Sequence, residues 1–334
     1  MGKILVTGAT GLLGAHLTCT LLSRGVSVKA LKRERSSFFL FERVAALYGI
    51  TSEHPDLNWV SGSLEDVFSL EEALRDVETV FHCAAFVSFF KKDADQMFRT
   101  NIRGTGNLVN ACLRAGNPYL LHVSSIAALG RSTAGEHINE QSAWMDSGQN
   151  TRYAVSKHLS ELEVWRGFEE GLPGCIINPG IIIGAGDGTS GSNMFFKRVN
   201  KGLRFFPTGV NGFVSVEDTV SLMLLLWDKK VMHERFIAVS ENVSYKYLLE
   251  EIATACGAGK PKVSISGTLY LLLKILTALL EPLIGKRLPV SYENIRLSNH
   301  VAYYSNEKAR AAGMHFEPLS LSILRTAQQL NPNA

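Results

Sequence analysis

A tyrosine and a lysine four residues apart are the residues whose types most directly suggest chemistry. Tyr153 and Lys157 stand in the stretch YAVSK, in a segment that we expect to be helical. The i, i+4 spacing places both side chains on one face of the helix, one turn apart. A free tyrosine hydroxyl has a pKa of about 10. A neighbouring ammonium group favours the phenolate, so we predict that Lys157 lowers the pKa of Tyr153 and makes it a general acid or base.

Two serines at the end of a short apolar run supply a second chemical group. Ser124 and Ser125 follow His122-Val123 in a predicted strand, and α/β proteins form their sites at the carboxyl ends of parallel strands. A serine hydroxyl there would bind a substrate oxygen and stabilise charge that develops on it. We choose Ser125 as the catalytic serine and Ser124 as the second choice. A turn serine with a purely structural role is the alternative.

A glycine-rich turn near the start of the chain predicts a dinucleotide site. The run from Gly8 to Gly14 (GATGLLG) follows a predicted strand and opens a predicted helix. Gly8 permits a tight turn, Gly11 lets a pyrophosphate approach backbone N–H groups, and Gly14 allows close packing of the helix on the strand. We expect Thr10 and Leu12, between the glycines, to contact the cofactor as well.

The end of the second predicted strand bears on the choice between NAD and NADP. An NAD site usually has an acidic residue about twenty positions after the glycines, which binds the ribose. Here the strand ends in Lys32-Arg33, and two cations suit a 2′-phosphate. We therefore expect NADP. Glu34 could bind the ribose instead, so NAD is also possible. Alternatively, Lys32 and Arg33 are a solvated strand end that contacts no cofactor.

These groups have to be positioned by a sheet with helices around it. Short β-branched runs alternate with helical stretches, which indicates βαβ units. We predict an α/β fold, a Rossmann doubly wound parallel sheet with a smaller, mainly helical substrate lobe. The predicted strands are 4–7, 26–31, 58–61, 79–83, 120–124 and 175–178, with late strands of the main sheet near 213–216 and 236–239. The predicted helices are 11–24, 70–75, 95–115 and 151–170.

The pattern of alternating strands and helices ends after Pro179, where a glycine-rich loop (GAGDGTSGSN) and apolar helical stretches follow. We assign 1–180 to a dinucleotide-binding domain, which is completed by the late strands near 213–239. We assign 181–212 and 240–334 to a substrate-binding lobe.

Composition and charge indicate a soluble enzyme that acts on a small molecule. The chain has 34 basic and 31 acidic residues, a net charge of +3, so we do not expect it to bind nucleic acid. Five cysteines without CxxC or metal-ligand spacing predict reduced thiols and no metal site. The chain runs into its first strand without a signal-peptide pattern, so we expect a cytoplasmic protein.

One stretch departs from this picture. Residues 268–285 (TLYLLLKILTALLEPLIG) are very apolar, yet they are short for a membrane span and are interrupted by Lys274, Glu281 and Pro282. We predict a buried or pocket-lining helix. A helix that makes a weak contact with a membrane surface is the first alternative, and a true span is the second.

Taken together, these residues resemble the extended short-chain dehydrogenase/reductase family, over nearly the whole chain and most specifically in its first 180 residues. The family's TGxxGxxG matches 7–14, and its catalytic residues match Ser125, Tyr153 and Lys157. Its Asn-x-x-Gly-Thr helix matches NIRGT from Asn101. The resemblance implies that Tyr153 is the general acid in reduction and the base in oxidation, and that Lys157 also binds the nicotinamide ribose. It implies that Ser125 holds the carbonyl oxygen and that Asn101 helps a water molecule to relay protons.

Further family motifs imply further cofactor contacts. The alanine-rich end of the fourth strand matches HCAA, and the Pro-Gly after the sixth strand matches NPG, whose following backbone contacts the nicotinamide amide in the family. Where many relatives have Gly-Asp-Leu near adenine, this chain has Gly62-Ser63-Leu64, so that contact is absent or passes to Asp66. The implied contacts are Leu64, Ala84, Ala85, Pro179 and Ile181.

Within the family, the chain looks most like the dihydroflavonol reductase and hydroxysteroid dehydrogenase branch. GVSVKALKR at 25–33 is similar to that branch's NADP-reading strand, with Arg33 at the phosphate-reading place. Members that bind sugar nucleotides have an Arg-Asp pair where this chain has Asn211-Gly212. Dehydratases have an acidic pair where Ile126-Ala127 follow the catalytic serine. Both departures argue against a sugar-nucleotide substrate.

We therefore predict an NAD(P)-dependent oxidoreductase that reduces a ketone or oxidises a secondary alcohol. An apolar substrate is expected from the aromatic residues of the lobe, although such residues more often form core. Those aromatic residues are Phe195, Phe196, Phe205 and Phe206. The alternatives are a nucleotide-sugar epimerase with tightly bound NAD and a non-catalytic protein that senses the cofactor. A homodimer is expected only because helix pairs of the family often form dimers.

Overall fold

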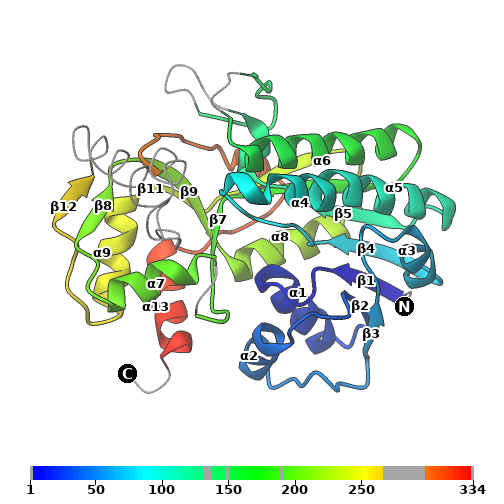
Figure 1. The fold of residues 1–334 in the computed structure, drawn as a ribbon, viewed down its shortest axis with the longest axis horizontal. Helices are drawn as coiled ribbons and strands as arrows, with labels where there is room; N and C mark the ends of the chain where they lie inside the picture. Colours follow the sequence, from blue (N-terminus) through cyan, green and yellow to red (C-terminus); the bar gives the residue numbers. More distant parts are fainter. Residues whose placement is uncertain (1–2, 131–136, 147–149, 189–190, 266–297, 332–334) are drawn as a thin grey trace.

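The computed structural model describes residues 3–130, 137–146, 150–188, 191–265 and 298–331 (Figure 1). The apolar stretch 268–285, for which we predicted a buried or pocket-lining helix, lies outside the described residues. In the part of the chain that the structure describes, no helix is both long enough and apolar enough to cross a membrane. All five cysteines are described, and each is a free thiol.

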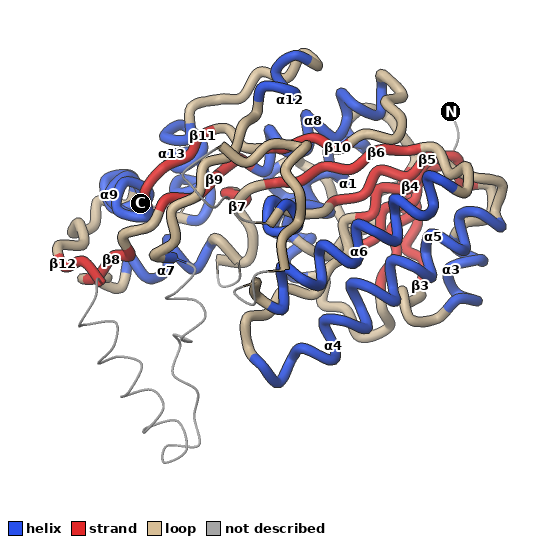
Figure 2. Tube along the Cα trace, turned by 90° about the horizontal axis from the view of Figure 1, so that it is seen from above, coloured by secondary structure: helices blue, strands red, loops and turns tan. Residues whose placement is uncertain are grey.

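Seven parallel strands form the main sheet (Figures 1 and 2). In spatial order they are β10 (Arg235–Ala238), β6 (Gly174–Pro179), β5 (Tyr119–Val123), β4 (Val77–His82), β1 (Lys3–Thr7), β2 (Val28–Lys32) and β3 (Leu57–Ser61). β5 and β6 are buried along their whole length, which is why their sequences are mainly apolar rather than alternating, with His122 and Asn178 as buried polar exceptions. The predicted parallel sheet is confirmed.

Helices cover both faces of this sheet, so the doubly wound arrangement is confirmed as well (Figure 1). One face packs against α1 (Leu12–Ser23), α2 (Phe39–Leu47) and α8 (Val216–Asp228). The other face packs against α3 (Val67–Ala73), α5 (Gly104–Arg114) and α6 (Arg152–Glu169). Near the end of the chain, α12 (Glu307–Ala311) contacts β10.

The order of the strands reverses between β1 and β4. The chain builds β1, β2 and β3 outward in one direction, and then returns to place β4, β5 and β6 on the other side of β1. In open α/β sheets, ligands bind outside the carboxyl ends of the strands at such a reversal. The glycine-rich turn at 8–14 directly follows β1, so it opens onto this crevice.

The helix that we predicted at 95–115 is interrupted by a wider turn. After a short 3-10 turn, η1 (Lys91–Asp93), the chain forms α4 (Ala94–Phe98), the π-helical turn η2 (Arg99–Arg103) and then α5. The helix predicted at 95–115 is confirmed as one continuous helical segment, and its π turn is a detail that apolar periodicity does not reveal. The turn carries Asn101, one of the predicted site residues.

A smaller lobe lies beside the main sheet, on the left in Figure 1. Its elements are β7 (Ile181–Ile183), α7 (Asn193–Asn200), β8 (Phe205–Pro207), β9 (Val210–Ser215), β11 (Glu241–Ser244), α9 (Tyr245–Ala255), β12 (Val263–Ile265) and α13 (Leu319–Leu330). The order β11-β9-β7 forms one small sheet, and β12 pairs with β8. Phe196, Phe213 and Leu248 are central to the lobe's own apolar core.

The strand predicted at 213–216 does not belong to the main sheet. It is β9, which pairs in parallel with β7 and in antiparallel fashion with β11. That prediction was wrong, because a short buried run has the same apolar pattern whichever sheet receives it. The strand predicted at 236–239 is β10, and it pairs with β6 as a main-sheet strand. Val216 begins α8, since the Ser215 hydroxyl accepts a hydrogen bond from the N–H of Asp218 at 2.9 Å and caps that helix.

Candidate active site

The glycine-rich turn has the geometry that a bound pyrophosphate requires. Gly8 has a φ of +72°, and a Cβ atom on it would lie 2.6 Å from the backbone nitrogen of Ala84. A Cβ atom on Gly14 would lie 2.2 Å from the Gly8 carbonyl oxygen, so only glycine lets α1 pack this closely. The N–H of Gly11 donates to that same carbonyl at 2.9 Å, and no side chain caps α1. The N–H groups of the first helical turn therefore remain for an anion.

The other predicted cofactor residues follow the carboxyl ends of the strands. Leu64 is buried, and its carbonyl accepts a hydrogen bond from the Asn107 amide at 2.9 Å. Ile181 opens β7 and lines the cavity described below. Asp66, the alternative adenine contact, caps α3 by accepting from the N–H groups of Phe68 and Ser69. The remaining predicted contacts, which lie at the edge of the same crevice or at a strand end, are Thr10, Leu12, Ala84, Ala85 and Pro179.

Two cations stand at the end of β2. The Lys32 ammonium lies over the ring of Phe38, 5.2 Å from its centre, and the Arg33 side chain is exposed. Neither forms a salt bridge with a carboxylate in the described chain. Both charges are thus open to a phosphate at this end of the crevice, which fits the predicted NADP.

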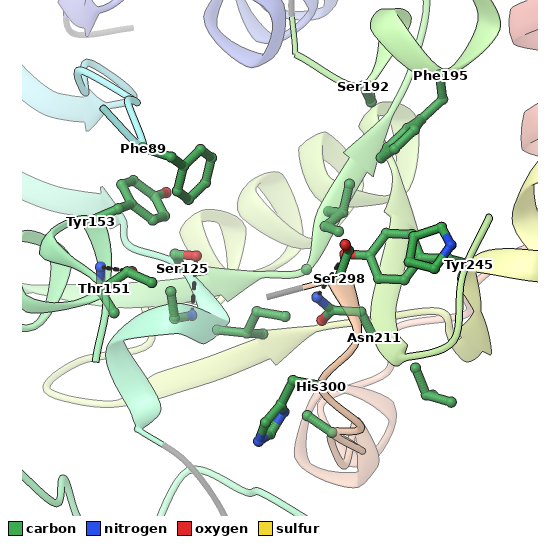
Figure 3. A pocket seen from close by; sticks show the side chains of 18 of the residues that line it. Phe89, Ser125, Thr151, Tyr153, Ser192, Phe195, Asn211, Tyr245, Ser298 and His300 are labelled. Atoms are coloured by element: carbon green, nitrogen blue, oxygen red, sulfur yellow. Dashed lines mark hydrogen bonds between the residues drawn. The ribbon is translucent and has the colours of Figure 1, made fainter. Parts of the chain in front are cut away.

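The catalytic helix begins as the sequence predicts. The Thr151 hydroxyl accepts from the N–H of Ala154 at 3.0 Å and caps α6, so Tyr153 lies in the first turn and Lys157 one turn further. Lys157 is only 2% exposed, and its ammonium donates to the Val123 carbonyl of β5 at 2.8 Å. Tyr153 faces a cavity and packs edge-on against Phe89, with 5.7 Å between ring centres (Figure 3).

Burial, not the neighbouring lysine, controls the protonation of Tyr153 in this structure. Burial raises the pKa of Tyr153 above its ordinary value, and the hydrogen bond with Ser125 opposes that rise. Burial lowers the pKa of Lys157 to about 8, although the carboxylate of Glu161 raises it. The predicted net lowering of the Tyr153 pKa was wrong, because burial has the largest effect on this group and raises its pKa. A phenol that stays protonated is the form needed to donate a proton in a reduction.

The two candidate serines occupy different surroundings. Ser125 caps η3 (Ile126–Leu129), where its hydroxyl accepts from the N–H of Ala127 at 3.2 Å, and it lines the cavity beside Tyr153 (Figure 3). Ser124 is buried, does not line that cavity, and has a hydroxyl with no hydrogen-bond partner among the described residues. The geometry therefore supports our choice of Ser125 over Ser124.

Asn101 lies in the π turn and holds the loop that follows β4. Its amide oxygen accepts from the N–H of Phe86 at 2.7 Å, and its nitrogen donates to the Phe86 carbonyl and to the Ser156 hydroxyl, both at 3.0 Å. Asn101 is 2% exposed. These contacts give it a positioning role beside α6, and the water relay stays a prediction.

Sequence reasoning missed a set of buried polar side chains beneath α6, which we call the polar layer: Thr7, His82, Thr105, Ser160 and His122. The His82 ring joins the Thr7 hydroxyl at 2.7 Å to the Thr105 hydroxyl at 3.0 Å, and Thr105 continues to Ser160 at 2.9 Å. The layer thereby ties β1 and β4 to α5 and α6. His82 and His122 are directly opposite each other on β4 and β5, a register that the sequence alone does not give.

Both histidines of the polar layer are neutral. Burial lowers the pKa of His82 to about 3, and the charge of Lys157 lowers it further. Burial and the same charge hold the pKa of His122 well below its ordinary value, and the two rings lie 5.1 Å apart. A cationic histidine next to the Lys157 ammonium would cost free energy through like-charge repulsion in a dry interior.

Ser125 is also held from below by a chain of polar contacts. The Asn178 amide of β6 donates to the Ser125 carbonyl at 3.1 Å and to the Glu161 carboxylate at 2.8 Å. The other oxygen of Glu161 pairs with Arg235 at 2.9 Å. Glu161 is one turn beyond Lys157 on α6, so these polar contacts fix Ser125 relative to α6.

A cavity of about 740 Å³ opens in front of Tyr153 and Ser125 and extends into the lobe (Figure 3). Of the four phenylalanines that suggested an apolar substrate, Phe195 and Phe205 line it, whereas Phe196 and Phe206 pack in the lobe's core. Most of its walls are apolar, and the polar side chains that line it besides Ser125 and Tyr153 are Asn150, Thr151, Ser192, Arg198, Asn211, Tyr245, Ser298, His300 and Tyr304. The cavity therefore connects Tyr153 and Ser125 to a large and mainly apolar space.

Comparisons with known proteins agree with this geometry. The family model described as "NAD dependent epimerase/dehydratase family" matches residues 4–238. The chain belongs to this family. Its match to that model and the fold above confirm the resemblance to the extended short-chain dehydrogenases/reductases, and the chain is an enzyme of the NAD(P)-dependent oxidoreductase type.

Curated relatives lie in the predicted branch. The chain is 33% identical to sterol demethylase protein B of Methylococcus capsulatus, over 88% of both chains. It is 28% identical to a putative dihydroflavonol 4-reductase of Synechocystis sp., over 91% of this chain and 87% of that protein. It is 25% identical to a 3-beta-hydroxysteroid dehydrogenase of Mycolicibacterium neoaurum, over 96% and 88%. The crystal structure of gox2253 has a TM-score of 0.82 at 25% identity and covers 99% of this chain and 98% of its own.

Proposed function

We propose that this protein interconverts a ketone and a secondary alcohol on an apolar substrate of sterol size, with NADP as its cofactor. The observation that carries the proposal is the position of Ser125 and Tyr153 at the mouth of a mainly apolar cavity of about 740 Å³. That volume lies within the range of about 300–1,000 Å³ of small-molecule sites. Sterol and hydroxysteroid enzymes among the relatives support the same substrate class.

The residues of the chain divide the chemistry among them. In the direction of reduction, Tyr153 donates its phenolic proton to the substrate oxygen, and its raised pKa keeps that proton in place until it is needed. The Ser125 hydroxyl donates a hydrogen bond to the same oxygen as negative charge develops on it. Lys157 binds the Val123 carbonyl, which fixes the register of α6 against β5. When bound, the nicotinamide supplies the hydride for the substrate carbon.

NADP is supported by the end of β2. Lys32 and Arg33 would bind the 2′-phosphate, while the N–H groups at the start of α1 would bind the pyrophosphate. A side chain on Gly8 would collide with the backbone of Ala84, and one on Gly14 with the backbone of Gly8. Glycine at both positions suits a turn whose backbone approaches a ligand closely.

The test is turnover of purified protein with NADPH and a panel of carbonyl compounds. The panel contains steroid ketones, short ketones and nucleotide sugars, and the readout is NADPH oxidation together with identification of the alcohol formed. We expect steroid ketones to be reduced with the highest kcat/KM. Turnover supported only by nucleotide sugars would refute the proposal.

The same panel addresses the two alternatives. An epimerase would co-purify with NAD and convert a nucleotide sugar without net oxidation of the cofactor. Against it, Asn211-Gly212 stand where members that bind sugar nucleotides have an Arg-Asp pair, and the walls of the cavity are mainly apolar, with Arg198 as the one arginine among its described lining residues. A cofactor-sensing protein would bind NADPH and reduce nothing on the panel. The homodimer, the membrane-surface contact of 268–285 and the cytoplasmic location remain predictions.

A further inference from the structure

The wall of the cavity opposite the catalytic pair contains a buried tyrosine that faces inward. Tyr245 is the first residue of α9 and is 6% exposed. Figure 3 shows its hydroxyl next to the amide of Asn211, on the far side of the cavity from Tyr153 and Ser125. Phe213 packs edge-on against the Tyr245 ring at 5.7 Å between centres, and Phe195 lies at 6.3 Å, so the ring is held in place from two sides.

The hydrogen bonds around Tyr245 leave its own proton without an acceptor. The Asn211 amide oxygen accepts from the N–H of Gly212 at 2.8 Å, which turns the amide nitrogen toward the tyrosine. That nitrogen donates to the Tyr245 oxygen at 3.3 Å. The Tyr245 oxygen is therefore an acceptor in this contact, and its O–H meets no acceptor in the described parts of the chain. Leaving a buried polar hydrogen unpaired costs about 1–3 kcal/mol, so a ligand atom that accepts it is favoured.

A second hydroxyl on the cavity wall is also unsatisfied. Ser192 precedes α7, is 7% exposed, and its oxygen has no hydrogen-bond partner among the residues that the structure describes. Buried polar groups are nearly always hydrogen-bonded, so the unpaired Ser192 hydroxyl is a second polar point on a mainly apolar wall, and Figure 3 shows it apart from the contact between Tyr245 and Asn211. Tyr245 and Ser192 both come from the lobe, whereas the catalytic hydroxyls come from the main domain.

We propose that Tyr245 binds a second oxygen of the substrate, a hydroxyl or a carbonyl at the end remote from the reacting carbon. The inference rests on the proposed function and narrows its substrate class to apolar molecules that carry an oxygen at each end. Tyr245 donates to that oxygen while Asn211 holds the phenol in place. A positioned remote oxygen orients the whole substrate and so sets which carbon meets Tyr153.

The experiment compares two ketones that differ only at the remote end. Dihydrotestosterone has one ketone and one distant hydroxyl, and 5α-androstan-3-one lacks that hydroxyl. We would measure kcat/KM for each with NADPH in the wild type, Tyr245→Phe and Ser192→Ala, and measure binding of each steroid by calorimetry with NADP⁺ present. Tyr119→Phe is the matched control, since it removes a buried tyrosine hydroxyl that bonds Val231 instead and does not line the cavity.

We expect the wild type to prefer dihydrotestosterone by about five- to tenfold or more, the size of one hydrogen bond. Tyr245→Phe should reduce this preference to about one- to twofold, whereas Ser192→Ala, at a separate point of the cavity wall, and Tyr119→Phe should leave it intact. Equal kcat/KM values for the two ketones in the wild type would overturn the inference. A decrease of kcat/KM in Tyr245→Phe that is the same for both ketones would overturn it as well.

Failure of the proposed function looks different. If neither ketone is reduced, the assignment of a steroid oxidoreductase fails, and calorimetry still decides the inference. Tighter binding of the hydroxylated steroid that is lost in Tyr245→Phe would uphold the subsite. Equal binding, or no binding of either steroid, would overturn it.

Discussion

The polar layer and the cavity wall of the lobe border the same site, yet they are held together by different forces. In the polar layer, hydrogen bonds of 2.7 to 3.0 Å run from β1 through His82 to α5 and α6. In the lobe, the wall is formed mainly by apolar side chains such as Phe195 and Leu249, which contact neighbours without fixed directions. Directional bonds fix the catalytic geometry, whereas apolar packing tolerates changes of shape, so we expect chemistry and substrate choice to respond differently to substitution.

The largest effect should come from the catalytic end. Tyr153→Phe removes the proton donor and keeps the ring that packs on Phe89. We expect kcat to fall by about 100- to 10,000-fold, the usual contribution of general acid catalysis, while NADPH affinity changes little. Steady-state rates with a steroid ketone and a fluorescence titration of NADPH check the two parts. Near-normal turnover of Tyr153→Phe would show that Tyr153 is not the proton donor.

The polar layer should make the protein sensitive to acid. His82 has a pKa of about 3 when folded and 6.5 when unfolded, so between these values the unfolded chain binds more protons. The stability that the neutral ring contributes is complete above pH 6.5 and is lost as the pH falls toward 3, by up to about 1.4 kcal/mol per pH unit. His82→Gln cannot titrate, so its free energy of unfolding should fall less steeply below about pH 6.5.

Urea unfolding at about pH 7.5, 6 and 5 measures that slope. His315→Gln is the control, because His315 is exposed and lies outside the polar layer. A slope in His82→Gln as steep as in the wild type would mean that His82 does not carry the acid sensitivity, and the contrast between the two regions would weaken.

A smaller effect, on the KM for NADPH, should arise at the end of β2, outside the polar layer and the cavity wall. Replacing Lys32 and Arg33 together by alanine removes two charge-assisted hydrogen bonds to a 2′-phosphate. We expect the KM for NADPH to rise by about 10- to 100-fold, with little change for NADH. Parallel kinetics with the two cofactors test it. An equal loss with both would show that the pair does not read the phosphate.

The smallest effect should come from the apolar wall. Phe195→Ala enlarges the cavity without removing any hydrogen bond. We expect the KM for a steroid ketone to rise by about three- to tenfold with kcat nearly retained, since lost apolar contact weakens ground-state binding and transition-state binding alike. Phe68→Ala, at a side chain that is 83% exposed, is the control. If kcat falls in Phe195→Ala as much as in Tyr153→Phe, the apolar wall affects the chemical step and not only substrate binding, which would contradict the proposed difference between the two regions.

Much of the catalytic side could be predicted because its residues act through local spacing. The glycines at 8–14 and the pair Tyr153 and Lys157 each lie within one turn or one helix, where sequence distance determines spatial distance. The sheet was predictable for a related reason, since buried parallel strands have long apolar runs.

The parts that could not be predicted depend on contacts between distant segments. The sequence does not reveal that His82 meets Thr7 and Thr105, because each pair is joined only by the folded sheet. The partner strands of β9 could not be predicted for the same reason. The π turn at Asn101 is local, but apolar periodicity does not distinguish it from an α-helical turn. The pKa of Tyr153 was mispredicted because a motif gives the neighbouring charge but not the degree of burial, and burial has the larger effect.

The path of the chain has a consequence for how substrate choice can be changed by recombination. After β6 the chain enters the lobe, returns for α8 and β10, enters again for β11 and α9, and later contributes α12 beside β10 and α13 beside α9. Exchange of one contiguous segment therefore cannot transfer the lobe of one relative to the main domain of another. Exchange of specificity in this architecture has to proceed by point substitutions on the cavity wall or by several matched crossovers at once.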